Sequence, residues 1–308
     1  MISAIVPHAG EPDSIWPTLR ALSNELPAIP NLIGDDDGRL NQRHMPRNAK
    51  IYAGPRQGFA ANVNQLAARV ETEWFLLLNN DVELHTGSGK RIKHFMKWAS
   101  AKTGLVATTI WQPDGTLDSF GDTFSWLLGR PLKRGRGTAD IVRADRLPLL
   151  SVSGAVMLVR TKAWRELGGL DEGFGQYYED VDFGWRAQAA GWRIKTLPGC
   201  NSTHLGGQSF PSVDRAYFGA RNNLWLIRRH QPDDETLLRR AERSWRFKAN
   251  RSEPDIAAAI TQGLLDGRSE DVPVSPSSKT AERALMWRHP SIGQEWRMVY
   301  QAFRHRSF

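Results

Sequence analysis

The stretch FLLLNNDVEL, residues Phe75–Leu84, places two amides and a carboxylate directly after a run of apolar residues. The apolar run is typical of a buried strand. A strand that only filled a core would not need Asn79, Asn80 and Asp81 at its end. Two explanations are open from this stretch alone. Asp81 can cap the following turn, or it can bind a hard divalent cation together with neutral amide oxygens.

The segments around this stretch alternate between strand and helix patterns. A helical face carries Ile15, Leu19, Leu22 and Leu26, with Asp13 or Ser14 as the expected N-cap and Pro27 as the stop. The alternation predicts a doubly wound α/β sheet with mainly parallel strands. The first predicted elements are strands at Ile2–Val6, Asn31–Gly34, Lys50–Ala53 and Trp74–Leu78, and a helix at Phe59–Val70.

Ligands of such sheets bind at the carboxyl ends of the strands. Asp35 and Asn79–Asp81 both fall at such ends, so we expect them to face one crevice. The segment Phe120–Asp145 is rich in Gly and Arg and is predicted to be a mobile loop. The remaining predicted elements are strands at Gly104–Ile110, Leu147–Arg160 (interrupted at Gly154) and Trp192–Leu197, and helices at Thr161–Leu167, Val181–Ala190 and Tyr217–His230.

The character of the chain changes after His230. A charged, helical stretch at Asp233–Asn250 precedes a polar, Pro- and Ser-rich linker at Gly267–Lys279. The final helix carries Trp296, Val299, Tyr300 and Phe303 at i, i+3, i+4 and i+7, with arginines around them. We expect this stripe to dock on the main domain; the alternative is a peripheral contact with an anionic membrane surface.

Composition narrows the class of partner. The formal net charge of +8 suggests an anionic partner, but the sequence has no zinc-type Cys/His spacing and no aromatic RNA-binding signature, which argues against nucleic acid. The single cysteine, Cys200, excludes an intrachain disulfide. No apolar run is long enough to span a bilayer, and the first residues lack the basic region of a secretory signal. We therefore expect a cytoplasmic protein.

A second acidic stretch, GGLDEGFGQYYEDVDFGWR, covers Gly168–Arg186. Carboxylates among aromatic side chains are partly desolvated, which raises their pKa and makes them better general bases. The alternative is a helix N-terminus whose acidic residues favour the helix dipole. For Asp182 we favour that structural role, in a helix pair with Arg186; for Asp180 we favour catalysis. His204, on an expected loop before Gly206 and Gly207, can reach the same crevice as a metal ligand.

The ordered set of motifs resembles the family 2 glycosyltransferases of the GT-A fold, and among them the rhamnosyltransferase-like members. The resemblance covers roughly Met1–His230. The motifs that carry it are Ile5-Val6-Pro7, the strand end at Asp35, GFAANVN (Gly58–Asn64), LLLNNDVEL (Leu76–Leu84), VSGAVMLVR (Val152–Arg160), GGLDEGF (Gly168–Phe174), YYEDVDFGWR (Tyr177–Arg186) and His204.

The resemblance implies a sugar nucleotide donor and a divalent cation, Mg²⁺ or Mn²⁺. Asn79-Asn80-Asp81 corresponds to the family's Asp-x-Asp motif, with Asp81 on the metal, His204 completing its shell and Asp180 as the catalytic base of an inverting reaction. The donor-binding set is Pro7, Asp35, Arg56, Gly58, Asn62, Asn80, Asp81 and Gly154.

Three departures from the family pattern are visible. Asn79 replaces the first Asp of the metal motif, Arg56-Gln57 replaces the usual Asn before Gly58, and IGDDDG (Ile33–Gly38) offers three aspartates, of which Asp35 is chosen by register. Asn79 keeps open a catalytically degenerate nucleotide- or glycan-binding protein. A nucleotidyltransferase is disfavoured because VPHAGEP is not a Gly-rich phosphate loop.

The sequence thus predicts a GT-A-type α/β domain at residues 1–230, with a nucleotide-binding half at 1–100 and an acceptor half at 101–230, and a helical extension at 231–308. The predicted activity is transfer of a sugar from dTDP-rhamnose or a UDP-sugar to a glycan or lipid-linked saccharide in polysaccharide biosynthesis, with possible peripheral membrane contact and no nucleic acid.

Overall fold

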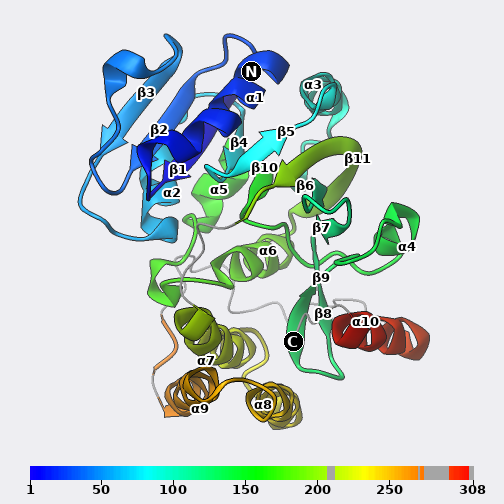
Figure 1. The fold of residues 1–308 in the computed structure, drawn as a ribbon. Helices are drawn as coiled ribbons and strands as arrows, with labels where there is room; N and C mark the ends of the chain where they lie inside the picture. The colour runs from blue at the N-terminus through cyan, green and yellow to red at the C-terminus, as the bar shows by residue number, and fades with distance from the viewer. Residues whose placement is uncertain (207–211, 270, 274–290, 305–308) are drawn as a thin grey trace.

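The computed structural model describes residues 1–206, 212–269, 271–273 and 291–304. A central sheet runs in the order β3-β2-β1-β4-β10-β6-β11-β5, and β7 pairs with β6 (Figure 1). The strands are β1 Ile2–His8, β2 Asn31–Asp35, β3 Ala49–Ala53, β4 Trp74–Leu78, β5 Val82–Leu84, β6 Thr103–Trp111, β7 Leu117–Ser119, β10 Val156–Arg160 and β11 Arg193–His204.

The predicted α/β sheet is confirmed. Strands β3, β2, β1 and β4 are parallel, and so are β6 and β11. Strand β10 lies between β4 and β6 and is antiparallel to both, with Val156 opposite Leu78. Its first residues therefore lie at the edge where the parallel strands end, and Asn79 N–H donates to the Ala155 carbonyl at 2.9 Å.

Helices cover both faces of the sheet because its strands are apolar on both sides. Along β4, Trp74, Leu76 and Leu78 face one core, and Phe75 and Leu77 face the other. The first core is closed by α1 (Trp16–Glu25) and α3 (Ser88–Trp98). The second is closed by α2 (Phe59–Ala67), α5 (Thr161–Leu167) and α6 (Glu179–Ala189).

Two predicted details near the N-terminus are wrong. Strand β1 continues through Pro7 to His8. Neither Asp13 nor Ser14 caps α1 with its side chain, because a 3-10 turn, η1 (Pro12–Ile15), leads into the helix and Ile15 occupies the N-cap position.

The predicted mobile loop at residues 120–145 is instead ordered. It forms a hairpin of β8 (Asp122–Ser125) and β9 (Arg130–Lys133), followed by a short helix, α4 (Ile141–Asp145). Phe120, Phe124 and Arg134 are fully buried. The turn carries Gly129 at φ 64°, where an added Cβ would lie 2.7 Å from the Leu237 carbonyl of a C-terminal helix. Glycine is therefore required for the hairpin to pack closely there.

Three C-terminal helices pack on α6 through a third core. They are α7 (Ser212–His230), α8 (Glu235–Ala249) and α9 (Pro254–Ser269); a fourth helix, α10 (Ile292–Arg304), contacts β8 instead. Trp185 of α6, Leu224 of α7, Trp245 of α8 and Leu264 of α9 share this core. The predicted linker overlaps the end of α9 at residues 267–269, and its residues 270 and 274–279 lie outside the described part of the chain. The domain boundary at residue 230 stays a prediction.

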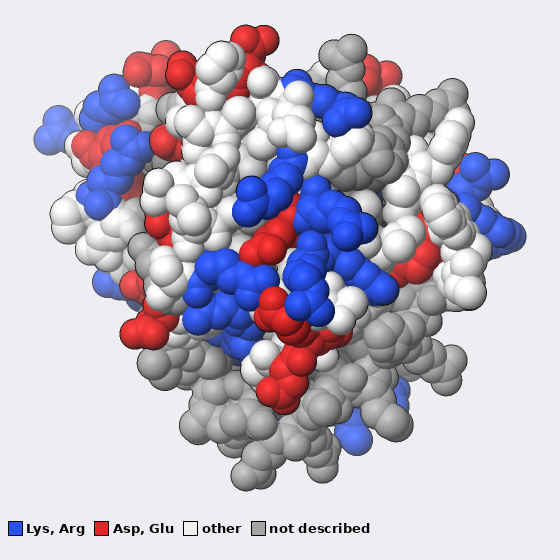
Figure 2. Space-filling model, turned by 90° about the horizontal axis from the view of Figure 1, so that it is seen from below, with Lys and Arg blue, Asp and Glu red and all other residues white. Residues whose placement is uncertain are grey.

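Charge is mixed on one face of the protein. The side on which α8 and α9 lie in Figure 1 faces the viewer in Figure 2, where Lys and Arg side chains gather with Asp and Glu among them. On these helices Arg268 forms ion pairs with Glu235 at 2.9 Å and Glu242 at 2.5 Å. The positive excess on this face is therefore interleaved with carboxylates.

A buried ionic network fixes α6 to α7. Asp182 is fully buried and pairs with Arg186 at 2.7 Å, which confirms the predicted helix pair, and also with Arg229 and His230 at 2.9 Å. Burial alone would raise the pKa of Asp182. The surrounding cations outweigh burial and hold this pKa well below its ordinary value. Arg229 continues the network to Asp171 at 2.6 Å.

Removing the central carboxylate should be strongly destabilising because it leaves buried cations without compensation. We expect Asp182→Asn to lower the free energy of unfolding by about 3–5 kcal/mol in urea titrations. The control is Lys162→Gln, which removes an exposed pair with Glu166 and should cost less than about 1 kcal/mol. A loss from Asp182→Asn as small as that of the control would contradict this role.

Candidate active site

The pairing of β5 with β11 brings Asp81 and His204 together. His204 lies opposite Val82, and Leu205 N–H donates to the Asp81 carbonyl at 2.9 Å. His204 is the last residue of β11. The sequence had predicted a loop at this position, and that prediction is wrong. The predicted strand at Trp192–Leu197 is longer than expected, since β11 continues past a register shift between Thr196 and Asn201.

The imidazole of His204 lies between two carboxylates. Its Nε2 is 3.2 Å from Asp81 Oδ1 and its Nδ1 is 3.4 Å from Asp118 Oδ2. Burial lowers the pKa of His204, but hydrogen bonds to Asp118 and Asp81 outweigh burial and raise the pKa to about 9. The ring is therefore an imidazolium at neutral pH in the metal-free protein.

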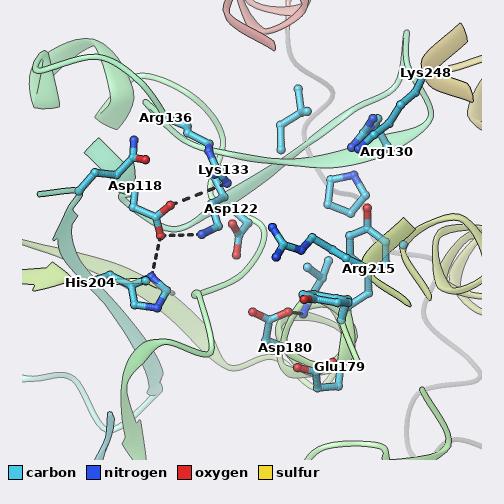
Figure 3. A pocket seen from close by; sticks show the side chains of 18 of the residues that line it. Asp118, Asp122, Arg130, Lys133, Arg136, Glu179, Asp180, His204, Arg215 and Lys248 are labelled. Carbon is cyan, nitrogen blue, oxygen red and sulfur yellow. Dashed lines mark hydrogen bonds and ion pairs between the residues drawn. The ribbon is translucent and has the colours of Figure 1, made fainter. Parts of the chain in front are cut away.

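Asp118, on β7, joins this pair to the basic side of the site (Figure 3). Its carboxylate lies 2.6 Å from Lys133 Nζ and 3.8 Å from Arg136 Nη1. Burial opposes ionisation, yet Lys133 and His204 hold the pKa of Asp118 far below its ordinary value. Sequence reasoning missed Asp118 because the stretch that contains it, WQPDGTLDSFG (Trp111–Gly121), carries turn signals and predicts no strand.

Asp180 is held at the first turn of α6, directly beside the start of β10. Its Oδ2 accepts from Gly154 N–H at 2.8 Å and its Oδ1 accepts from Val181 N–H at 2.8 Å. Burial raises the pKa of Asp180, and the hydrogen bonds from these two N–H groups offset part of this increase. Tyr177 and Tyr178 precede it at φ 67° and 72°. Such backbone strain at non-glycine residues is typical of functional sites.

Asp122 and Glu179 lie with Asp180 on the wall of one cavity. Burial and the neighbouring Asp180 raise the pKa of Asp122 to about 8, and the same two causes raise the pKa of Glu179 to about 8. Figure 3 shows Glu179 next to Asp180, and Asp122 near Lys133. Crowded carboxylates with raised pKa values are typical of sites that handle protons.

Two adjoining cavities share His204 and Tyr177. The first cavity, of about 690 Å³, contains most of the predicted donor-binding residues on its wall. The second, of about 600 Å³, contains Asp180 on its wall. Gly154 lies beside Asp180 and Phe59, which lines the first cavity. The predicted residues on the first cavity are Pro7, Arg56, Gly58, Asn62, Asn80, Asp81 and His204.

Asp36, and not the predicted Asp35, lies on the wall of the first cavity. The Asp35 carboxylate is buried and accepts from Leu40 N–H at 2.7 Å and from Asp37 N–H at 3.3 Å, so it organises the following turn. Asp36 lines the first cavity, and burial raises its pKa to about 6. The donor contact predicted for Asp35 stays a prediction, and the residue of this strand end that lines the cavity is Asp36, because successive residues of a strand face opposite sides.

His8 also lines the first cavity, and sequence reasoning missed it. Its Nδ1 lies 2.8 Å from Asn80 Nδ2, and burial lowers the pKa of His8, so the ring is neutral. Its buried Nε2 has no hydrogen-bond partner within the described residues. The sequence feature that could have identified His8 is its position directly after Pro7, at the carboxyl end of the first strand.

The residues present fit a divalent cation that is shared with a substrate. No group of three or more His, Cys, Asp and Glu side chains in the described residues is arranged to hold a metal. Asn79 Oδ1 is buried and accepts no hydrogen bond from any described group, and the buried Asp81 Oδ1 faces His204 Nε2 at 3.2 Å. Mg²⁺ is usually bound by one or two carboxylates together with substrate phosphates. Asp81 matches that pattern as the carboxylate, and His204 can add an imidazole nitrogen once its ring loses a proton.

Comparison with known proteins shows a likeness to one family of enzymes. Residues 135–221 match the model of "Glycosyl transferase family group 2". The chain is 28% identical over 226 residues to N-acetylglucosaminyl-diphospho-decaprenol L-rhamnosyltransferase of Mycobacterium tuberculosis, covering 64% of this chain and 73% of that protein. The chain resembles the family 2 glycosyltransferases.

The chain also matches the O-antigen biosynthesis protein RfbC of Myxococcus xanthus, with 25% identity over 94% of the chain but only 24% of RfbC. Its fold is similar to GalNAc-T7 solved with UDP, GalNAc and Mn²⁺, with a TM-score of 0.58 and 13% identity over 87% of this chain and 55% of that one. It is also similar to the mannosyltransferase PcManGT of Pyrobaculum calidifontis solved with GDP-Man and Mn²⁺, with a TM-score of 0.54 and 12% identity over 88% and 76% of the two chains.

These likenesses confirm the predicted GT-A-type fold and the rhamnosyltransferase-like family. Both curated relatives have names that connect them with sugar transfer or O-antigen biosynthesis, which confirms the predicted class of enzyme. Among the described residues, no helix is both long and apolar enough to cross a membrane.

The raised pKa of Asp122 predicts how stability depends on pH. The unfolded chain loses this proton near pH 4, whereas the folded protein retains it until about pH 8. The folded state therefore binds more protons between these values, and stability falls as pH rises through this window. We expect Asp122→Asn to make the free energy of unfolding fall less steeply between pH 5 and 8, measured by urea titration. An unchanged slope would contradict the assignment.

Proposed function

We propose that the protein is a metal-dependent, inverting glycosyltransferase. Its donor is a nucleoside diphosphate sugar, dTDP-rhamnose or a UDP-sugar, and its acceptor is a glycan or a lipid-linked saccharide of cell-envelope polysaccharide synthesis. The observation that carries the proposal is the meeting of Asp81 and Asp180 at adjoining cavities joined by His204. The names of the relatives, which include a rhamnosyltransferase for a diphospho-decaprenol acceptor, support the substrate classes.

The donor nucleotide occupies the first cavity in this proposal. Pro7 and Asp36 lie at the carboxyl ends of β1 and β2, where nucleotides bind in sheets of this kind. Gly58 has φ 88° and begins α2, so backbone N–H groups at the helix N-terminus are available to anionic oxygens. Arg56, Asn62 and Asn80 complete the donor-binding set.

Asp81 and His204 would hold the cation. A divalent cation supplies neutralisation of the charge that develops on the departing diphosphate. His204 must give up its proton to ligate a metal, so binding of the cation is coupled to deprotonation of the ring.

Asp180 is the general base. It takes the proton of the acceptor hydroxyl as that oxygen forms its bond to the anomeric carbon, while the bond from this carbon to the diphosphate oxygen breaks. The Gly154 N–H at 2.8 Å orients the carboxylate. The raised pKa of Asp180 makes it a stronger base than an exposed aspartate once it is ionised. Attack opposite the leaving group inverts the anomeric centre without a second carboxylate nucleophile.

The second candidate is a catalytically degenerate binder of nucleotide or glycan, favoured by Asn79 in place of the usual first Asp of the metal motif. Replacing the base separates the two. We expect Asp180→Asn to lower kcat by about 10²–10⁴-fold and to retain donor binding, measured as a thermal shift with a sugar nucleotide and Mn²⁺. Asp233→Asn, at an exposed position, is the control. Unchanged turnover in Asp180→Asn would reject the assigned base, and a wild-type protein that binds donors without turnover would support the binder.

The donor itself is identified by a thermal-shift screen of sugar nucleotides with and without Mn²⁺. Ligands that bind only the folded state raise the melting temperature by mass action. We expect one class of sugar nucleotide to stabilise the wild type more strongly with Mn²⁺, and Asp81→Asn to remove the additional effect of the metal. Stabilisation by no donor would contradict the proposed function.

We further propose that α10 contacts an anionic membrane surface. The predicted apolar stripe is divided: Val299 is buried with Met298, whereas Trp296 and Tyr300 are 62% and 64% exposed. Glu295 fixes the helix to the β8–β9 hairpin by accepting from Ser125 Oγ and Trp126 N–H, both at 2.8 Å. The side chain of Phe303 lies outside the described set.

Arginines beside α10 complement an anionic surface. Ile292 is 80% exposed and continues the outer face at i, i+4 and i+8 with Trp296 and Tyr300. Between α4 and α10 lies a cavity of about 280 Å³ whose wall carries Arg143, Arg146 and Arg297 and no carboxylate among the described residues. Exposed aromatic side chains next to arginines are typical of helices that lie in the membrane interface.

This surface is tested by sedimentation with vesicles of phosphatidylglycerol or phosphatidylcholine. We expect binding to the anionic vesicles only, and a several-fold loss for the double variant Trp296→Ser, Tyr300→Ser. Trp98→Ser, which removes an equally exposed tryptophan from α3, is the matched control and should bind as the wild type does. Equal binding of all three proteins would contradict the assignment.

A further inference from the structure

The second cavity is lined by cations from three separate parts of the chain. Arg130 and Lys133 come from β9, Arg215 from α7 and Lys248 from α8, and Arg136 follows the hairpin. Figure 3 shows Arg215 directed toward Asp122 and Asp180, with Lys248 and Arg130 beside one another. The wall opposite the proposed base is therefore basic.

Two of these cations share one indole ring. The Arg130 guanidinium carbon lies 4.7 Å and Lys248 Nζ lies 5.2 Å from the centre of the Trp245 ring. Burial, together with the smaller effects of Arg130, Arg215 and Arg136, lowers the pKa of Lys248 to about 8. Lys248 forms no ion pair with a carboxylate in the described part of the chain. Cations held close together in a cavity bind an anion strongly because it relieves their repulsion.

Three carboxylates of the same cavity are not available to pair with Lys248. Asp118 is already engaged by Lys133, Arg136 and His204. Asp122 and Glu179 have pKa values of about 8, so they retain protons near neutral pH. An additional anion is therefore favoured beside Lys248, on the basic wall of the cavity.

We infer that the second cavity contains a phosphate subsite for the acceptor, completed by Lys248 of α8. The inference rests on the proposed function, in which the diphosphate of the donor lies beside Asp81 in the first cavity. An anion bound near Lys248 in the second cavity then belongs to the other substrate, whose reacting hydroxyl lies at Asp180. The acceptor class is a saccharide that carries a phosphate or diphosphate group. The C-terminal extension is thus part of the substrate site.

The test compares two acceptors of the same sugar in steady-state transfer by the full chain: a saccharide 1-diphosphate and an uncharged alkyl glycoside. Lys248→Met retains the apolar stem against Trp245 and removes the charge. We expect Lys248→Met to raise KM for the diphosphate acceptor about tenfold or more, because hydrogen bonds to charged groups are strong. The KM for the glycoside and the KM for the donor should stay unchanged. Lys248→Arg should restore most of the affinity, and Lys162→Met, at an exposed position, is the control.

A second measurement does not depend on turnover. Calorimetric titration of the metal-free protein with inorganic pyrophosphate should give binding that Lys248→Met weakens about tenfold, while the affinity for a nucleoside diphosphate is retained.

The inference is overturned if Lys248→Met changes neither the KM for the two acceptors nor the affinity for pyrophosphate. It is also overturned if the variant raises KM for both acceptors equally. A loss of affinity for the nucleoside diphosphate would overturn it as well, because the subsite would then belong to the donor. A wild type without transfer but with pyrophosphate binding that depends on Lys248 would reject the proposed function and retain the anion site.

Discussion

The pairing of β5 with β11 is the constraint on which the site depends. Its register places His204 opposite Val82, and the hydrogen bond from Leu205 N–H to the Asp81 carbonyl fixes the two backbones next to each other. The imidazole is then held between Asp81 and Asp118, so one side chain connects the first cavity to the second. A slip of this register by one residue would turn His204 to the opposite face of the sheet and separate the two carboxylates.

The antiparallel strand β10 provides the second half of the same arrangement. Because it enters the sheet at the edge where β4 ends, Gly154 lies close to Asn79–Asp81 in the fold although it is far away in the sequence. Its N–H then holds the Asp180 carboxylate. The buried network around Asp182 fixes α6 from the other side. The sheet and one helix therefore position Asp81 and Asp180, the two carboxylates of the proposed site.

The parts that the sequence predicts best are those decided by local pattern. Strand β4 and helix α5 have the predicted bounds, because an uninterrupted apolar run and a Gly-terminated helix are local signals. Errors arise where tertiary contacts decide. The β8–β9 hairpin owes its order to packing on α7 and α8, where Asn223 donates to the Gly129 carbonyl at 2.9 Å. Asp35 and Asp36 are distinguished only by which side of the strand end each one faces. Lys248 carries no signal in its own helix, since only the fold brings it to Arg130 and Asp180.

The central claim is that one cleft binds a metal at Asp81 and directs the transferred sugar toward Asp180. It is tested most directly by a crystal structure of Asp180→Asn with Mn²⁺ and the donor selected by the screen, with data collected at the manganese absorption edge. The account predicts one anomalous peak in coordination contact with Asp81 and the donor diphosphate, and a sugar whose anomeric carbon faces residue 180. A manganese ion bound away from Asp81, or a sugar directed away from residue 180, would contradict it.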